Sequence, residues 1–286
     1  MKILVTGADG QLGHELQYVC QEFPEFEMIF LNRTGLDIVN KEQMNTLFSS
    51  LKPDFCINCA AYTAVDKAET DIDLCRDINA NGTENLAINC RDHNTTLVHI
   101  STDYVYNIDV NRPLLESDTP NPKGVYAETK RAGELKALEI WEKSIIIRTS
   151  WVYSSFGNNF VKTMLRLGQE RDQLSIVSDQ IGTPTYARDI AKTILSIISQ
   201  IKTSEPSVFG IYNFSNRDET NWADFAKAIF EIKGIECEVG QMTTKEYGAA
   251  AHRPLWSVLS KEKIKNTFGI KPRPWKVSLI ECLSLL

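Results

Sequence analysis

The 286-residue chain is predicted to be an α/β protein, with a doubly wound parallel sheet and a smaller C-terminal α/β lobe. Three observations predict this class. Short runs rich in Val and Ile alternate with longer helical patterns over the first 150 residues, a loop of evenly spaced glycines follows the first run, and proline-bearing turns become frequent later. Strands that are covered by helices on both faces are typically continuous apolar runs, and strand–helix alternation is typical of right-handed parallel crossovers.

The elements follow in order along the chain. The expected strands of the sheet are residues 2–7, 27–32, 54–60, 96–102 and 144–150, and the helices between them cover about 11–23, 41–51, 71–93 and 126–142. Later helical patterns cover about 159–170, 188–200 and 222–233, with short strand candidates at 174–177 and 210–214. We therefore expect a first domain at residues 1–150 and a mainly separate, discontinuous lobe at 151–286.

Composition excludes several classes of function. The formal net charge is −6 and no block of Lys and Arg occurs, which argues against a nucleic-acid partner. No apolar stretch approaches the roughly 18 residues that a membrane span needs. The N-terminus lacks the pattern of a signal peptide, and seven cysteines at scattered spacings do not form a disulfide framework. The expected location is the cytoplasm.

The glycine loop is the first functional signal. Gly7, Gly10 and Gly13 follow the first strand at intervals of three and open the first helix. Glycine permits a tight turn and lets a pyrophosphate approach the backbone, while the helix N-terminus offers unpaired amides. A plain tight turn would not require three regularly spaced glycines. Residues 1–150 are therefore predicted to be a Rossmann-type dinucleotide-binding domain.

The end of the second strand bears on the choice of cofactor. An acidic residue there would bind the ribose 2′-hydroxyl of NADH, but this chain has Asn32 and Arg33, and its first acid is Asp37. Because Arg33 can pair with a 2′-phosphate, the sequence favours NADPH and leaves NADH open. The alternative is that Arg33 is only a solvated loop charge.

A hydroxyl and a Tyr–Lys pair are the expected catalytic groups. Thr102 ends the fourth strand, and Tyr126 and Lys130 share one face of the following helix. Reduction of a ketone places negative charge on its oxygen, so Tyr126 can supply a proton and Thr102 a hydrogen bond. Lys130 is expected to lower the pKa of Tyr126 and to hold the nicotinamide ribose. Tyr-x-x-x-Lys alone is also compatible with ordinary helix neighbours.

Several motifs together resemble the dTDP-4-dehydrorhamnose reductase family, within the extended short-chain dehydrogenase/reductases. They are the glycine loop, "NCAAYTAVDKAE" (58–69), "STDYVY" (101–106), the Tyr–Lys pair, "RTSWVY" (148–153), "DQIGTPT" (179–185) and "HRPLWS" (252–257). The resemblance covers essentially the full chain. It implies reduction of dTDP-4-dehydro-L-rhamnose, a dTDP-linked 4-keto sugar, to dTDP-L-rhamnose with NADPH or NADH.

The resemblance also implies site residues. The catalytic set is Thr102, Tyr126 and Lys130. The expected cofactor-binding set is Gly7, Gly10, Gln11, Leu12, Gly13, Asn32, Arg33, Asp37, Ile38, Ala61, Tyr62, Thr63, Tyr126 and Lys130. The expected substrate-binding set is Thr63, Val65, Thr102, Asp103, Tyr104, Trp151 and Arg253. Arg253 is chosen for the nucleotide diphosphate because of its charge and its place in "HRP".

Other features have weaker or competing interpretations. Some members of the family use magnesium across a dimer through glutamates of the first helix; Glu15 fits that place, but no metal site is predicted and a homodimer is left open. His99 is expected to be a core histidine, and Trp151 to be either core or a pocket wall. The competing functions are a related nucleotide-sugar epimerase or dehydratase, and a non-catalytic NADP-binding subunit resembling methionine adenosyltransferase beta.

Overall fold

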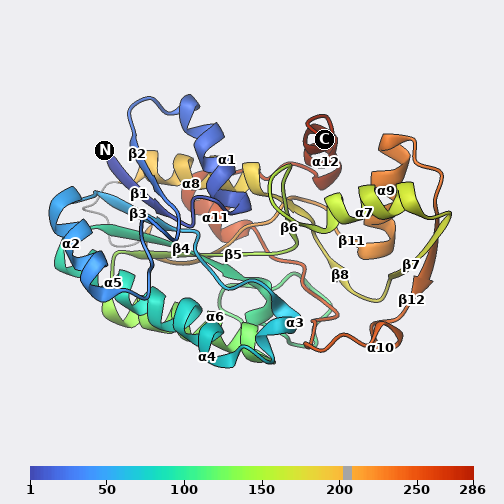
Figure 1. Cartoon of the computed structure of the whole chain (residues 1–286), viewed down its shortest axis with the longest axis horizontal. Helices are drawn as coiled ribbons and strands as arrows, with labels where there is room; N and C mark the ends of the chain where they lie inside the picture. Colours follow the sequence, from blue (N-terminus) through green and yellow to red (C-terminus); the bar gives the residue numbers. More distant parts are fainter. Residues whose placement is uncertain (202–207) are drawn as a thin grey trace.

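The computed structural model describes residues 1–201 and 208–286. Its central sheet has the strand order β10-β5-β4-β3-β1-β2, and every neighbouring pair is parallel (Figure 1). The strands are β1 (Lys2–Thr6), β2 (Glu27–Leu31), β3 (Phe55–Asn58), β4 (Thr96–Thr102), β5 (Ser144–Thr149) and β10 (Gly210–Asn213). The predicted doubly wound parallel sheet is confirmed.

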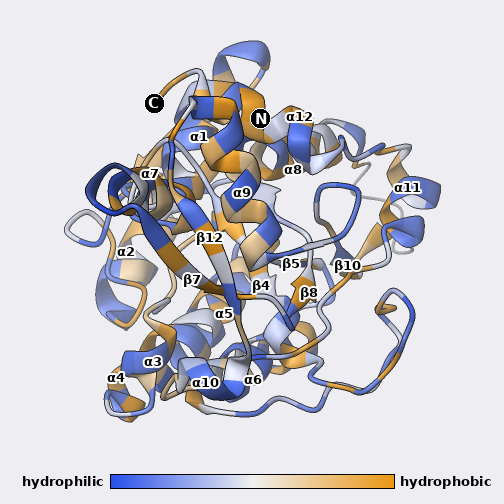
Figure 2. Ribbon diagram, turned by 90° about the vertical axis from the view of Figure 1, so that its right-hand side faces the viewer, coloured by the Kyte–Doolittle hydropathy of each residue, from blue (hydrophilic) through white to orange (hydrophobic). Residues whose placement is uncertain are grey.

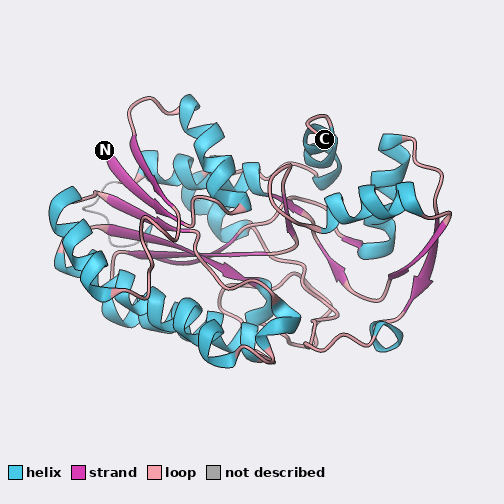
Figure 3. Ribbon diagram, viewed as in Figure 1, coloured by secondary structure: helices cyan, strands magenta, loops and turns pink. Residues whose placement is uncertain are grey.

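Helices cover both faces of this sheet (Figure 3). One face is covered by α1 (Gln11–Val19), α8 (Ala187–Gln200) and α11 (Glu262–Phe268), and the other by α2 (Lys41–Leu51), α5 (Thr83–Asp92) and α6 (Val125–Ile140). Successive side chains of β1 alternate between the two cores: Ile3 and Val5 pack with α1 and α8, whereas Leu4 packs with α2 and α5. All three are fully buried, which explains why the strand is continuously apolar in sequence.

The helix predicted at 71–93 is interrupted. It consists of α4 (Ile72–Arg76), a wide π-helical segment (Asp77–Gly82) and α5. Such segments are often found at functional sites, since they turn side chains away from the regular helical face. Here the segment directs Asn79 at the loop after β3, in which the short helix α3 (Val65–Ala68) was not predicted.

The second lobe has its own small core. Strands β7 (Gln173–Val177) and β12 (Glu238–Met242) pair in parallel, and each mixes hydrophilic and hydrophobic residues along its length (Figure 2). They pack with α7 (Phe160–Glu170) and α9 (Trp222–Lys233), and α12 (Trp275–Leu283) lies beside α9. The remaining short elements are η1 (Cys20–Glu22), η3 (Asp103–Val105), β6 (Val152–Tyr153), β8 (Ile181–Gly182), β9 (Thr185–Tyr186), β11 (Thr220–Asn221) and α10 (Thr244–Tyr247).

The two lobes share segments of the chain. Helix α8 and strand β10 come after residue 150, yet α8 packs on α1 and β10 pairs with β5 in the sheet. A division of function at residue 150 stays a prediction. Within the described ranges, no helix is both long and apolar enough to cross a membrane.

The strand order creates a site for a ligand. The chain runs from β1 outward to β2 and then returns to β3 on the other side, so the order reverses between β1 and β3. In open α/β sheets, the crevice outside the carboxyl ends of the strands at such a reversal is where ligands bind. This edge faces the second lobe (Figure 1).

Candidate active site

The three glycines after β1 have different structural tasks. Gly7 has φ of +68°, and a Cβ there would lie 2.6 Å from the backbone nitrogen of Ala60, after β3. A Cβ on Gly13 would lie 2.5 Å from the backbone oxygens of Gly7 and Ala8. Gly10 is the N-cap of α1 with an ordinary φ of −79°, and among the described residues its Cβ position meets only the Gly7 oxygen, at 3.2 Å. Gly7 and Gly13 are therefore needed by the fold, and Gly10 is not.

The N-terminus of α1 is suited to a phosphate. No side chain of the described ranges caps it and no acidic residue lies in its first turn, so its free amides and partial positive charge are available to an anion. Gln11 accepts a hydrogen bond from Asn159 Nδ2 at 2.9 Å, which links this loop to the second lobe, while Leu12 is buried beneath it.

We predict that Gly10→Val keeps the fold and weakens NADPH binding by about tenfold or more, because the side chain occupies space that a pyrophosphate needs. Calorimetric titration with NADPH measures the effect. The control is Gly13→Ala, which should lower the melting temperature because its Cβ collides with backbone. A folded Gly10→Val protein with unchanged NADPH affinity would contradict the assignment.

The loop after β2 contacts the glycine loop through a polar side chain. Asn32 Nδ2 donates to Asp9 at 2.9 Å, and Asn32 Oδ1 accepts from the amide of Gly35 at 3.1 Å. The Arg33 side chain is 74% exposed, and its Nε lies 3.6 Å from Asp37. Ile38 is buried against Gly82 of the π-helical segment. The Arg33 guanidinium is thus weakly held and accessible to a phosphate.

We predict that Arg33→Ala weakens NADPH by about tenfold and leaves NADH nearly unchanged, since one charge-assisted contact is worth about 1.5–3 kcal/mol. The matched control is Arg91→Ala, which removes an exposed arginine at the end of α5, far from the carboxyl edge. Titration of each variant with both cofactors tests this. Equal losses for NADPH and NADH would show that Arg33 does not recognise the 2′-phosphate.

The loop after β3 is held in place by the π-helical segment. Asn79 Oδ1 accepts from the Tyr62 amide at 2.8 Å, its Nδ2 donates to the Tyr62 carbonyl at 3.1 Å, and the Tyr62 hydroxyl donates to Asp71 at 2.8 Å. Ala61 and Tyr62 are half-buried, Thr63 is exposed and Val65 begins α3. This loop therefore forms a fixed wall next to the glycine loop.

Two of the three expected catalytic residues, Thr102 and Tyr126, lie at the end of β4. Thr102 Oγ1 donates to Asp103 at 3.0 Å and accepts from the Tyr104 amide at 3.3 Å. Tyr126 lies near Thr102, and its ring meets that of Tyr104 edge-to-face with the ring centroids 5.6 Å apart. Helix α6 starts next to this site because the Val125 amide donates to Glu69 at 2.9 Å. Lys130 follows one turn later on the same helix.

The structure changes the role expected of Lys130. Its Nζ donates to the Ile100 carbonyl at 2.6 Å and lies 3.3 Å from His99 Nε2, so it extends toward β4. Burial raises the pKa of Tyr126, and the nearby Thr102 hydroxyl opposes this change. The expectation that Lys130 lowers the pKa of Tyr126 is therefore not met: the side chain is long enough to find partners in the strand.

Asp103 carries an available acceptor beside these groups. Its side chain is buried, and burial raises its pKa to about 7, although the hydrogen bond from Thr102 opposes the shift. The second carboxylate oxygen, Oδ2, has no hydrogen-bond partner among the residues of the described ranges. Buried polar atoms are normally paired, so this oxygen is suited to a ligand hydroxyl.

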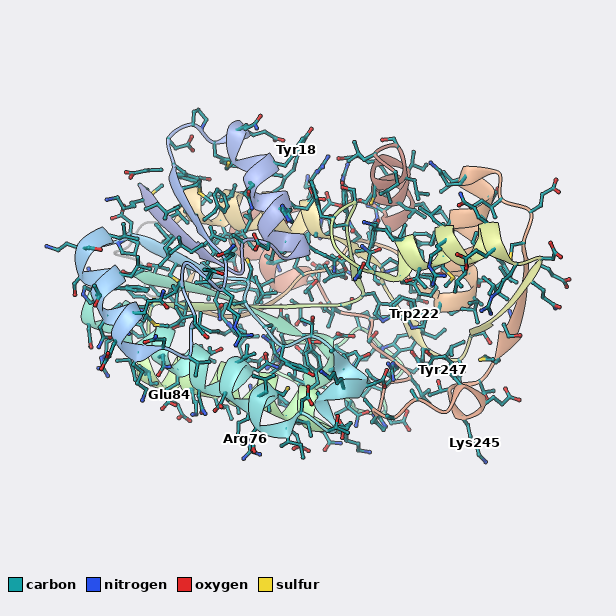
Figure 4. All side chains as sticks on the ribbon, in the orientation of Figure 1. Tyr18, Arg76, Glu84, Trp222, Lys245 and Tyr247 are labelled. Carbon is teal, nitrogen blue, oxygen red and sulfur yellow. The ribbon has the colours of Figure 1, made fainter. Side chains whose placement is uncertain are left out.

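Two tryptophans border the site from the second lobe. Trp151 has φ of +46°, unusual for a bulky residue, and stacks on Trp222 with ring centroids 3.7 Å apart. Trp222 Nε1 donates to Gln180 at 3.0 Å and lies on the side of its lobe that faces the sheet (Figure 4). Trp151 is half-buried, which fits a wall better than a core position.

Arg253 is paired more tightly than expected. Its guanidinium donates to both carboxylate oxygens of Asp66 in α3, at 2.9 and 2.6 Å, and the bond holds the pKa of Asp66 below its usual value. The pair connects the "HRP" segment to the loop after β3. A diphosphate would therefore meet an arginine that Asp66 already orients, and its role toward that ligand stays a prediction.

Sequence reasoning did not assign a role to Asn58, Asp66 or Asn79, and the amphipathic pattern of residues 221–232 predicted that Trp222 is a core residue. Asn58 and Asp66 lie in the motif "NCAAYTAVDKAE", and Asn58 is also a polar residue at the end of an apolar strand, whereas Asn79 gave no signal. Glu15, the position considered for magnesium, is fully buried; it accepts from Arg188 Nε at 2.8 Å and from Ser154 at 2.6 Å. Glu15 is thus a structural partner of Arg188 within this chain.

Known proteins resemble the whole chain. Residues 1–286 match the family described as RmlD substrate binding domain. A dTDP-4-dehydrorhamnose reductase from Aggregatibacter actinomycetemcomitans is 40% identical over 285 residues, with 97% of each chain covered. A solved structure of a dTDP-4-dehydrorhamnose reductase from Clostridium acetobutylicum is 41% identical, has a TM-score of 0.94 and covers 100% of this chain and 99% of its own. One from Bacillus anthracis, in complex with NADP, is 38% identical with the same TM-score and coverage.

Proposed function

The chain belongs to the RmlD substrate binding domain family, and from this premise we propose that it is a dTDP-4-dehydrorhamnose reductase. It reduces the 4-keto group of dTDP-4-dehydro-L-rhamnose to the hydroxyl of dTDP-L-rhamnose. NADPH, when bound, supplies the hydride, and NADH is the alternative donor. The phosphates of either cofactor fit the uncapped N-terminus of α1.

One observation supports the chemistry most strongly. Thr102 and Tyr126 lie together at the carboxyl edge of the sheet, where the order of the strands reverses. Thr102 hydrogen-bonds the carbonyl oxygen, and Tyr126 gives its proton to the alkoxide that develops there. Because burial raises the pKa of Tyr126, the phenol keeps its proton until that strongly basic oxygen forms. A ketone reductase needs an acid that is still protonated when the hydride arrives.

The remaining residues position the sugar nucleotide. The free oxygen of Asp103 accepts a sugar hydroxyl, Tyr104 and Trp151 form the walls, and Arg253 binds the diphosphate. Two contacts support this arrangement: Asp103 accepts a hydrogen bond from Thr102, and the ring of Tyr104 contacts the ring of Tyr126. The specificity for dTDP over other nucleotides is proposed from the relatives' names.

The test follows NADPH oxidation with dTDP-4-dehydro-L-rhamnose, and then with UDP- and GDP-linked 4-keto sugars. We expect turnover with the dTDP sugar and little with the others. Conversion of a dTDP-hexose without net NADPH oxidation would instead identify an epimerase or dehydratase. Tight NADPH binding without turnover of any sugar would identify a non-catalytic subunit.

We also propose that the protein acts in the cytoplasm, with small molecules and without nucleic acid as partners. All seven cysteines are free, as a reducing compartment requires. A homodimer stays a prediction, which light scattering can test.

A further inference from the structure

The segment between α10 and α11 borders the proposed substrate site. Residues 251–260, here called the strap, contact Asp66, Ile181 and Leu114 in turn. The first residues of the strap contact Asp66 of α3, its middle pairs with Ile181 through two backbone hydrogen bonds of 2.8 Å, and its end pairs with Leu114 in the same way. In Figure 1 the chain after α10 runs toward α3. The strap therefore joins the loop after β3 to the second lobe.

The first contact of the strap depends on one carboxylate. Asp66 Oδ1 accepts from the Ala251 amide at 3.0 Å and from Arg253 Nη1 at 2.9 Å, and Oδ2 accepts from Arg253 Nη2 at 2.6 Å. Arg253 Nη1 also donates to the Ala251 carbonyl at 3.2 Å, so the turn closes around Asp66. Ile181 and Leu114 bond the strap through backbone atoms, whereas Asp66 does so through its side chain, so a single substitution can remove this contact.

These bonds use one edge of the Arg253 guanidinium and leave another. A guanidinium has an end edge, formed by Nη1 and Nη2, and a side edge, formed by Nε and Nη2, and each edge presents two parallel N–H donors. Asp66 occupies the end edge. Among the described residues, no acceptor bonds Nε or the second hydrogen of Nη2. The side edge is therefore free for a second anion, and its two donors match two oxygens of one phosphate group.

The free edge belongs to a guanidinium close to the proposed acid. The Arg253 side chain is 18% exposed and that of Asp66 is 47% exposed, so the carboxylate lies on the outer side of the pair. Burial raises the pKa of Tyr104 and the charge of Arg253 opposes this change, because the guanidinium lies near the Tyr104 hydroxyl. The ring of Tyr104 in turn contacts that of Tyr126. Tyr104 therefore connects the acid to Arg253, and a glycosyl diphosphate can span that one side chain.

We propose that Asp66 is a positioning residue for the sugar nucleotide: it holds the end edge of Arg253 so that the side edge meets the diphosphate. The inference deepens the proposed function and rests on its assignment of Arg253 to the diphosphate. A long arginine side chain loses rotational freedom when it binds a ligand, and a side chain that is already held loses less. Asp66 thus lowers the cost of binding, although its own charge repels the ligand.

The charge and the geometry of Asp66 predict opposite results. The bond from Arg253 lowers the pKa of Asp66, so its carboxylate is ionised at neutral pH. By charge alone, removal of this carboxylate would strengthen the binding of an anion. In Asp66→Asn, by contrast, the new amide nitrogen faces an N–H donor of Arg253, so the end edge is no longer held. Positioning therefore predicts weaker binding, and the sign of the change separates the two effects.

Calorimetric titration of the full chain with dTDP measures this sign. We expect Asp66→Asn to weaken dTDP binding by about threefold to tenfold, the cost of ordering one long side chain on binding. The control is Asp92→Asn at the end of α5, since the Asp92 side chain is 51% exposed and pairs with the adjacent Arg91. This control removes the same charge and should leave dTDP binding unchanged. Unchanged or tighter binding of dTDP by Asp66→Asn would overturn the proposal.

Two variants of Arg253 test the role of the edges. Arg253→Lys keeps the charge but has no planar pair of donors, so it should weaken dTDP binding by about fivefold or more. Wild-type affinity in Arg253→Lys would overturn the proposal. In an Arg253→Gln background, Asp66→Asn should no longer weaken dTDP binding, because no guanidinium remains to be positioned. An equal loss in both backgrounds would show that Asp66 does not act through Arg253, and would also overturn the proposal.

Steady-state kinetics separate this inference from the proposed function. With NADPH and dTDP-4-dehydro-L-rhamnose, Asp66→Asn should raise KM by about threefold to tenfold and change kcat by less than about twofold, because Tyr126 and the cofactor site are unchanged. A loss of kcat at unchanged KM would overturn the inference. A wild type that binds dTDP but reduces no sugar would refute the reductase function, while the dTDP titrations would still decide the role of Asp66.

Discussion

Tyr126→Phe should lower turnover of the 4-keto sugar by about 10²–10⁴-fold, the usual contribution of a positioned acid, while NADPH affinity stays close to wild type. The substitution removes only the hydroxyl beside Thr102 and keeps the ring, so the edge-to-face contact with Tyr104 survives. Steady-state kinetics with NADPH and dTDP-4-dehydro-L-rhamnose, together with calorimetric titration of the cofactor, measure both quantities. Near-normal turnover would mean that Tyr126 is only a neighbour of Lys130 on the helix.

Lys130→Met is the informative companion variant. It should lose turnover and also weaken NADPH, because the amine is proposed to hold the nicotinamide ribose. If the two residues act as one unit, the double variant should be little slower than Tyr126→Phe. Multiplied losses would instead indicate that Tyr126 and Lys130 contribute independently to the reaction.

The nucleotide-binding half was predictable because its signals are local. Apolar runs of strand length, helical periodicity and the glycine spacing can each be recognised within a dozen residues, and they gave the positions of β1 to β5 and of the main helices. The predictions failed where elements depend on distant partners. β6, β8, β9 and β11 are two residues long, and pairing with remote segments defines them, not their own pattern.

The same distinction applies to the site. Thr102 and Tyr126 were recognisable because their residue types and places at a strand end and on a helix carry chemical meaning. The partners that orient the site come from far away: Asp66 and Arg253 are 187 residues apart, and Asn58 and His99 are 41 apart. The reach of Lys130 was also misjudged, since one-turn spacing gives the direction of a side chain and not its hydrogen-bond partner.

The catalytic helix α6 is joined to the sheet by a fully buried ion pair. One turn after Lys130, Glu134 accepts from Arg148 of β5 through both oxygens, at 2.8 and 2.7 Å, and both side chains are 0% exposed. The Arg148 guanidinium also lies 4.7 Å from the ring centroid of Tyr106. Burial would raise the pKa of Glu134, but the bonds from Arg148 outweigh it and lower the pKa overall.

Glu134→Leu should therefore lower the free energy of unfolding by about 3–5 kcal/mol at neutral pH, because it leaves the Arg148 charge buried without its partner. The double variant Glu134→Leu with Arg148→Met should recover most of that loss, since removing both charges also removes their desolvation cost. Urea denaturation of the three proteins measures the effect. A double variant as unstable as Glu134→Leu would show that the pair itself, and not the unpaired charge, determines stability.

The pH dependence of the free energy of unfolding provides an independent check of the Glu134–Arg148 pair. A carboxyl whose folded pKa is below its ordinary value of about 4.5 stabilises the fold above that value, and this contribution is lost as the pH falls through the folded pKa. The wild type should therefore lose stability in acid more steeply than the double variant, which has no carboxyl at position 134.

If the pair also fixes α6 on the sheet, the double variant should fold well but reduce the sugar more slowly, because Lys130 and Tyr126 are carried by that helix. Full stability with full turnover would mean that packing of α6 alone places the catalytic residues.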